Sequence, residues 1–146
     1  MRSIGIDLHK TYAHVFELGE QGGGKHYRVP LTETDLAAFL QTLDQDAQVV
    51  MEASTSSFRF SEMLSPHAGR VVVSDPAQTR GALSKSLVND HKAAEALARL
   101  LQSNFVREVW TPPPTYRALR SQVSLYLDLS RIRTQLINRL KSLFQQ

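Results

Sequence analysis

The order of strand-like segments in the first part of the chain constrains the fold most strongly. Three short segments rich in β-branched or aromatic residues come first, at residues 2–8, 12–18 and 25–30, and turn-prone residues separate them. This spacing predicts a meander of three antiparallel strands. The first strand also contains Asp7, and a desolvated carboxylate is costly unless it is paired, hydrogen-bonded or bound to a cation.

Helix-like and strand-like segments then alternate. A capping-box pattern, Thr32-x-x-Asp35, predicts the start of a helix. Residues 47–52 (AQVVME) and 71–74 (VVVS) are short apolar runs, and an amphipathic segment at residues 58–64 lies between them. Strand, helix and strand in this order predict a parallel pair, so the first and fourth strands can be neighbours in an α/β sheet.

The rest of the sequence predicts three helices and one boundary. Asp75-Pro76 is a helix-start signal for a short helix over residues 77–83, and residues 89–102 form an alanine-rich, amphipathic helix. The three prolines at 112–114 mark a module boundary, which predicts domains at 1–111 and 112–146. One long helix follows, with a coiled-coil-like stripe of Leu125, Leu129, Ile132, Leu136, Leu140 and Leu143.

Composition is that of an ordinary globular domain, with 42% hydrophobic and 21% charged residues. The sequence has no cysteine, which excludes disulfides and thiolate-bound metal centres. It shows neither a signal-peptide pattern nor an apolar run near the roughly 20 residues of a membrane span. These features predict a soluble, cytoplasmic protein without a membrane partner.

The formal net charge of +3 is divided unevenly. Residues 115–146 carry six basic side chains against one acid, Asp128, a net charge of +5 that leaves −2 for residues 1–114. A basic arm on a slightly acidic body is typical of proteins that bind a polyanion, most often nucleic acid. A solvated helix face has the same composition, so charge alone leaves both interpretations open.

Three acids come from different segments that an α/β sheet can bring together. Asp7 lies in the first strand, Glu52 at the carboxyl end of the fourth, and Asp90 at the start of the alanine-rich helix. Carboxylates that converge repel one another unless a divalent cation lies between them. Taken singly, Glu52 can be a surface residue and Asp90 a helix N-terminal charge. The five histidines are scattered in the sequence without a helical metal pair, and we interpret them as surface residues.

Three motifs, in order, resemble a known family. GIDLHK at 5–10, MEAS at 51–54 and NDHKAAEALARLL at 89–101, followed by a long basic helix, resemble the amino-terminal domain of DEDD transposases of the insertion-sequence-110 type. The resemblance implies an RNase H-like (RuvC-like) mixed sheet with flanking helices. It also implies four acids that hold Mg²⁺ or Mn²⁺, in a recombinase guided by a structured RNA that pairs with DNA. Asp7, Glu52 and Asp90 match the first three acids, as catalytic and metal-binding residues.

The fourth acid of the family pattern is missing. The family motif places a second aspartate three residues after the first, and this chain has Ala93 there. Glu95 is not an obvious substitute. The chain also stops where family members continue into a second domain with a serine nucleophile, so we expect it to be a fragment of a longer transposase.

We therefore expect the catalytic domain of an RNA-guided DNA transposase, impaired by Ala93, that associates with another copy through its last helix. Two alternatives stay open: a non-catalytic nucleic-acid-binding and dimerisation module, and a stand-alone RNase H-like nuclease or junction resolvase. Basic side chains before Asp90 and along the last helix are expected to contact RNA or DNA phosphates: Arg80, Lys85, Arg131, Arg133, Arg139 and Lys141.

Overall fold

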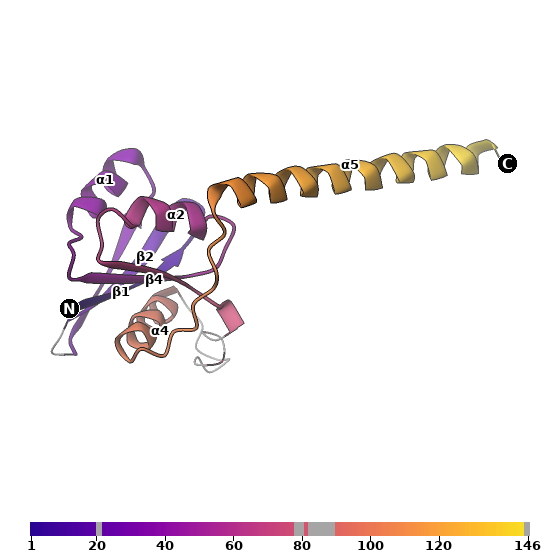
Figure 1. Ribbon diagram of the computed structural model, residues 1–146. Helices are drawn as coiled ribbons and strands as arrows, with labels where there is room; N and C mark the ends of the chain where they lie inside the picture. The colour runs from indigo at the N-terminus through magenta and orange to yellow at the C-terminus, as the bar shows by residue number, and fades with distance from the viewer. Residues whose placement is uncertain (20–21, 78–80, 82–89, 145–146) are drawn as a thin grey trace. The chain divides into compact units, whose positions relative to one another are not determined.

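The computed structural model describes residues 1–19, 22–77, 81 and 90–144, with the side chain of Asp90 left out. The described chain divides into two compact units, Met1–Trp110 and Thr111–Gln146. The first unit holds a sheet with helices on both of its faces (Figure 1). The second holds a single long helix, α5 (Pro114–Phe144).

Five strands form one sheet in the described part of the chain: β1 (Arg2–Leu8), β2 (Tyr12–Leu18), β3 (Gly24–Pro30), β4 (Ala47–Glu52) and β5 (Arg70–Ser74). Their order across the sheet is β3-β2-β1-β4-β5. The strands β1, β2 and β3 are antiparallel neighbours, whereas β4 runs parallel to both β1 and β5. The meander, the parallel pair and the neighbouring first and fourth strands predicted from the sequence are confirmed.

Two helices cover one face of the sheet and a third covers the other (Figure 1). The helices α1 (Glu33–Gln41) and α2 (Ser57–Leu64) share the first face, and α4 (Asp90–Gln102) lies on the second. The predicted cap of α1 is present, because the Thr32 hydroxyl accepts a hydrogen bond from the Asp35 backbone N–H at 3.2 Å. The short helix predicted over residues 77–83 falls largely outside the described residues.

Alternation along the strands divides the core between the two faces. Ile4 and Ile6 of β1 join Met51 of β4 in the cluster that packs against α1 and α2. Val50 of β4 packs instead against Leu97 of α4. Neighbouring residues on a strand therefore face different helices, which decides which polar side chains lie beside α4.

The helix α4 lies directly on the backbone of β1. A Cβ atom added to Gly5 would lie 2.0 Å from the Ala94 carbonyl oxygen and 2.7 Å from the Ala98 nitrogen. Glycine at position 5 and alanines at 94 and 98 thus allow the backbones of strand and helix to approach closely. This approach holds the first turn of α4 near the carboxyl end of β1.

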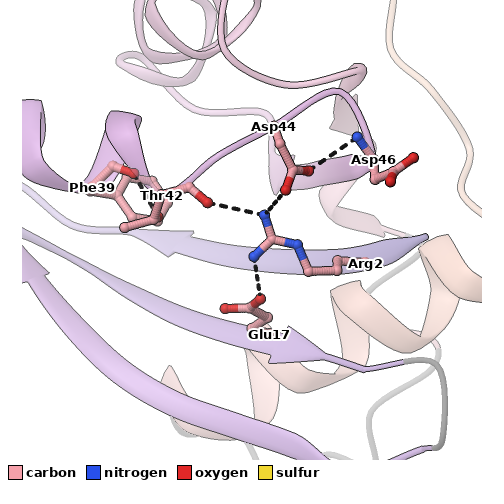
Figure 2. Close-up of polar contacts among 6 residues, drawn as sticks. All are labelled: Arg2, Glu17, Phe39, Thr42, Asp44 and Asp46. Atoms are coloured by element: carbon pink, nitrogen blue, oxygen red, sulfur yellow. Dashed lines mark hydrogen bonds and ion pairs between the residues drawn. The ribbon is translucent and has the colours of Figure 1, made fainter.

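Arg2 fastens the other end of β1 (Figure 2). Its guanidinium donates to Glu17 Oε1 of β2 at 2.7 Å, to the Thr42 carbonyl oxygen at 3.0 Å and to Asp44 Oδ2 at 2.9 Å. Burial opposes the charged form, yet the hydrogen bonds and charges of Glu17 and Asp44 raise the pKa of Arg2. The start of β1 is therefore held to β2 and to the connection between α1 and β4.

Within the described residues, no helix is both long enough and apolar enough to cross a membrane.

Candidate functional site

Asp7 and Glu52 end up on neighbouring strands at the same edge of the sheet. The last paired residues of β1 and β4 are Ile6 and Met51, and each acid follows one of them. Ile6 and Met51 both face α1 and α2, so by alternation the two acids face the side of α4. The strands are parallel, so the two acids lie together at their carboxyl ends, an edge at which open α/β sheets often bind ligands.

The carboxylate of Asp7 is half-buried and held by a neighbour. His9 Nε2 lies 3.2 Å from Asp7 Oδ2, and 27% of the Asp7 side chain is exposed. The His9 ring stacks on Tyr12 with 4.4 Å between centroids. The guanidinium carbon of Arg28 lies 3.4 Å from the centroid of the same Tyr12 ring. A histidine stacked on an aromatic ring therefore lies against the Asp7 carboxylate.

The first turn of α4 lies near this edge. His14 of β2 is the cross-strand partner of Asp7, and the ring of His91, the second residue of α4, lies 3.9 Å from the His14 ring. Asp90 begins the helix at this end. Ala93 is half-buried one residue before Ala94, which packs on Gly5.

The donor set at this edge suits a hard divalent cation. Asp7 and Glu52 offer carboxylate oxygens, the ligands that Mg²⁺ prefers, and both remain partly open to solvent. The methyl group of Ala93 supplies no donor. The carboxylates of Asp7 and Glu52 therefore fit an ion such as Mg²⁺.

The predicted nucleic-acid-binding residues fall in two groups. Arg80 and Lys85 lie outside the described residues. Arg131, Arg133, Arg139 and Lys141 are exposed on α5, and Arg131 makes an ion pair with Asp128 at 3.2 Å. An exposed pair of this kind contributes little to stability, so it does not prevent Arg131 from contacting a phosphate.

A histidine cluster was missed in the sequence. His14, His26 and His91 each place a ring nitrogen within 4.8 Å of the other two, so the interpretation of these three as scattered is wrong. His26 and His91 are exposed, as predicted, whereas His14 is buried. The strand register explains the contact, because His26 pairs with Phe16, two residues after His14 on the same face of β2. The contact could not be predicted, because the sequence does not specify which residues of β2 and β3 lie opposite each other.

Comparison with known proteins identifies the family to which the chain belongs. Residues 4–146 match a family described as Transposase, a class of proteins that act on DNA. The chain belongs to the DEDD transposase family of the insertion-sequence-110 type, which confirms the resemblance of the three motifs. A search of curated proteins found no match.

Proposed function

We propose that this chain is the RNase H-like (RuvC-like) catalytic domain of an RNA-guided DNA transposase that acts in the cytoplasm. The observation that carries the proposal is the position of Asp7 and Glu52, on adjacent parallel strands at the edge where α4 begins. Asp90, the first residue of α4, completes a group of three acids from three elements.

The sheet supports the proposed fold. Three antiparallel strands are followed by two that run parallel to the first, in the order β3-β2-β1-β4-β5. This arrangement agrees with an RNase H-like domain, in which acids of the first and fourth strands meet beside a later helix. Membership of the transposase family adds the DNA substrate.

In this proposal Asp7, Glu52 and Asp90 hold Mg²⁺ or Mn²⁺. A divalent ion bound there would stabilise charge at a phosphodiester and help to orient the attacking group. Two neighbours define the site: His9 Nε2 lies 3.2 Å from the Asp7 carboxylate, and the close contact of Gly5 with Ala94 places α4 on β1. Ala93 leaves one ligand position without an anion, so we expect weak metal binding and impaired cleavage.

The basic residues of α5 provide the proposed contacts with nucleic acid. Arg133, Arg139 and Lys141 are exposed, as is Arg131, and arginine and lysine contacts to phosphates supply affinity without reading sequence. We propose that these side chains, with Arg80 and Lys85, contact a structured guide RNA or DNA.

We also propose that α5 associates with a second copy. Leu129, Ile132, Leu136 and Leu140 are exposed along one stripe, and a single helix cannot bury its own stripe. Sedimentation of the chain should show an oligomer that the double substitution Ile132→Ser and Leu136→Ser disrupts. The control Thr134→Ser and Asn138→Ser should leave it intact; a strict monomer at high concentration would contradict the proposal.

Ala93 favours one alternative function, a non-catalytic module that binds nucleic acid and dimerises. A module of that kind needs no metal at the acidic edge. A stand-alone nuclease or junction resolvase is disfavoured by the same residue, because it would need all four acids. Metal binding at Asp7 therefore separates the proposed catalytic domain from the non-catalytic module.

The test is the effect of Mg²⁺ on thermal unfolding. A ligand that binds only the folded chain stabilises it by mass action, so Mg²⁺ should raise Tm, and Asp7→Asn or Glu52→Gln should abolish the rise. The control Glu33→Gln changes an exposed acid of α1, on the opposite face of the sheet, and should retain it. A rise of equal size in Asp7→Asn would refute the proposed site.

A further inference from the structure

Three imidazoles from three separate elements meet at the edge of the sheet beside α4. His14 belongs to β2, His26 to β3 and His91 to the first turn of α4. Ring centroids lie 3.9 Å apart for His14 and His91, 5.2 Å for His26 and His91, and 5.8 Å for His14 and His26. We propose that these histidines bind a transition metal ion of the Zn²⁺ class, separate from the acidic site.

The distances suit such an ion. The candidate nitrogens lie within 4.8 Å of one another, whereas two nitrogens bound tetrahedrally at about 2.1 Å from Zn²⁺ are about 3.4 Å apart. Small rotations of the exposed His26 and His91 side chains would close that difference, because only His14 is buried. The pocket around the rings has a volume of about 300 Å³, enough for an ion and a water ligand.

The chemistry of the ligands separates this site from the acids. Imidazole nitrogen suits Zn²⁺, Ni²⁺ and Cu²⁺, whereas Mg²⁺ selects carboxylate, carbonyl and water oxygens. Asp7 and His14 are cross-strand partners, so the two sites are neighbours with different preferences. Because Zn²⁺ can also bind carboxylate oxygens, substitutions of the histidines and of Asp7 are needed to distinguish the two sites.

Glu95 provides the negative charge that a bound cation favours. Its Oε2 atom lies 3.8 Å from His26 Nε2, and its Oε1 atom pairs with Arg99 one turn later. A carboxylate that hydrogen-bonds to a metal-binding histidine typically orients the ring, and a small movement would bring Glu95 from 3.8 Å into that range. Glu95 lies one helical turn after His91 on α4, so it faces the same side as the cluster.

A metal ion in this position would fasten the first turn of α4 to β2 and β3. The ligands come from two strands and one helix, so binding requires the folded arrangement and adds to its stability. The turn that contains His91 also contains Asp90 and Ala93. The proposed ion would therefore act as a structural clamp beside the acidic site.

The experiment is Zn²⁺ titration of the metal-free chain without a histidine tag, followed by calorimetry and by thermal unfolding. We expect one Zn²⁺ per chain and a Zn²⁺-dependent rise in Tm. His26→Ala and His91→Ala replace exposed ligands and should each abolish both signals. Glu95→Gln should weaken Zn²⁺ binding about 10- to 100-fold, as changes to outer-sphere partners do.

Two controls distinguish the histidine cluster from a lone surface histidine and from the acidic site. His67→Ala removes an exposed histidine outside the cluster and should bind Zn²⁺ like the original chain. Asp7→Asn should also retain the Zn²⁺ response, even where it abolishes the response to Mg²⁺.

If the double variant His26→Ala and His91→Ala bound Zn²⁺ as tightly as the original chain, the proposal would be overturned. Stabilisation by inorganic phosphate with none by Zn²⁺ would overturn it too, because Arg28 also lines the pocket.

Discussion

At the scale of single residues, Tyr27 of β3 should make the stability of the chain depend on pH. Burial and then the negative charge of Glu17 raise the pKa of Tyr27 to about 12, whereas an unfolded tyrosine titrates near pH 10. The folded state therefore keeps the Tyr27 proton at pH values where the unfolded state has lost it. The stability that this difference provides is lost as the pH rises from about 10 to about 12.

Tyr27→Phe should remove this loss. We expect the free energy of unfolding of the variant, minus that of the original chain, to increase as the pH rises from about 9 to about 11.5. Urea unfolding at several pH values measures the difference, and lysines that titrate in both proteins cancel. A difference that stays constant across this range would contradict the stated cause.

At the scale of elements, the contact between α4 and β1 depends on Gly5. The Cβ atom of an alanine at this position would lie 2.0 Å from the Ala94 carbonyl oxygen, so α4 would have to move away from the sheet. Gly5→Ala should lower the free energy of unfolding by about 1–3 kcal/mol, the usual cost of overpacking. Urea denaturation of both chains measures this loss.

The matched control is Gly23→Ala. No atom lies within 4 Å of a Cβ added to Gly23, so this substitution should change stability by less than about 0.5 kcal/mol. Equal effects of the two substitutions would mean that Gly5 matters through chain entropy and not through the position of α4.

Periodicity predicted the elements well, because each has a local signal. The three antiparallel strands, α1 with its Thr32 cap and the long helix after the prolines all follow from apolar spacing and capping residues. The position of Asp7 beside Glu52 needed one further assumption, that the first and fourth strands pair, and the structure confirms that pairing.

The surroundings of the site could not be predicted in the same way. The contact of His9 with Asp7 and the histidine cluster depend on which residues face each other across strands and on where α4 crosses the sheet. Long-range packing fixes both, and neither has a local signal in the sequence. The roles of Asp7, Glu52 and Asp90 stay predictions, because position alone does not demonstrate metal binding.

At the scale of the whole molecule, the uneven distribution of charge predicts how nucleic-acid binding should depend on salt. The α5 residues Arg131, Arg133, Arg139 and Lys141 should supply most of the affinity for nucleic acid. Replacing all four with glutamine should weaken binding to duplex DNA and flatten the dependence of log K on log salt by roughly 0.9 per lost phosphate contact. Binding isotherms at several salt concentrations measure the slope.

The control removes the same charge from the first unit. Lys10, Lys25, Arg59 and Arg70 are exposed there, and their replacement with glutamine should change the slope less. Equal slopes for the two quadruple variants would show that total charge, and not the helix, determines binding.

The proposed function depends above all on one metal site shared by positions 7, 52, 90 and 93. Ala93→Asp supplies the acid that the resemblance to the family implies at this position, so it should enlarge the Mn²⁺-dependent rise in Tm, since a ligand that binds the folded state more tightly stabilises it more. Without metal the substitution should be neutral or mildly destabilising, because it adds repulsion near Asp90.

The decisive measurement compares melting curves of three chains, each with and without Mn²⁺: the original chain, Ala93→Asp, and the double variant Ala93→Asp with Asp7→Asn. We predict a larger rise in Ala93→Asp that Asp7→Asn removes; an equal rise in all three chains would contradict the shared site.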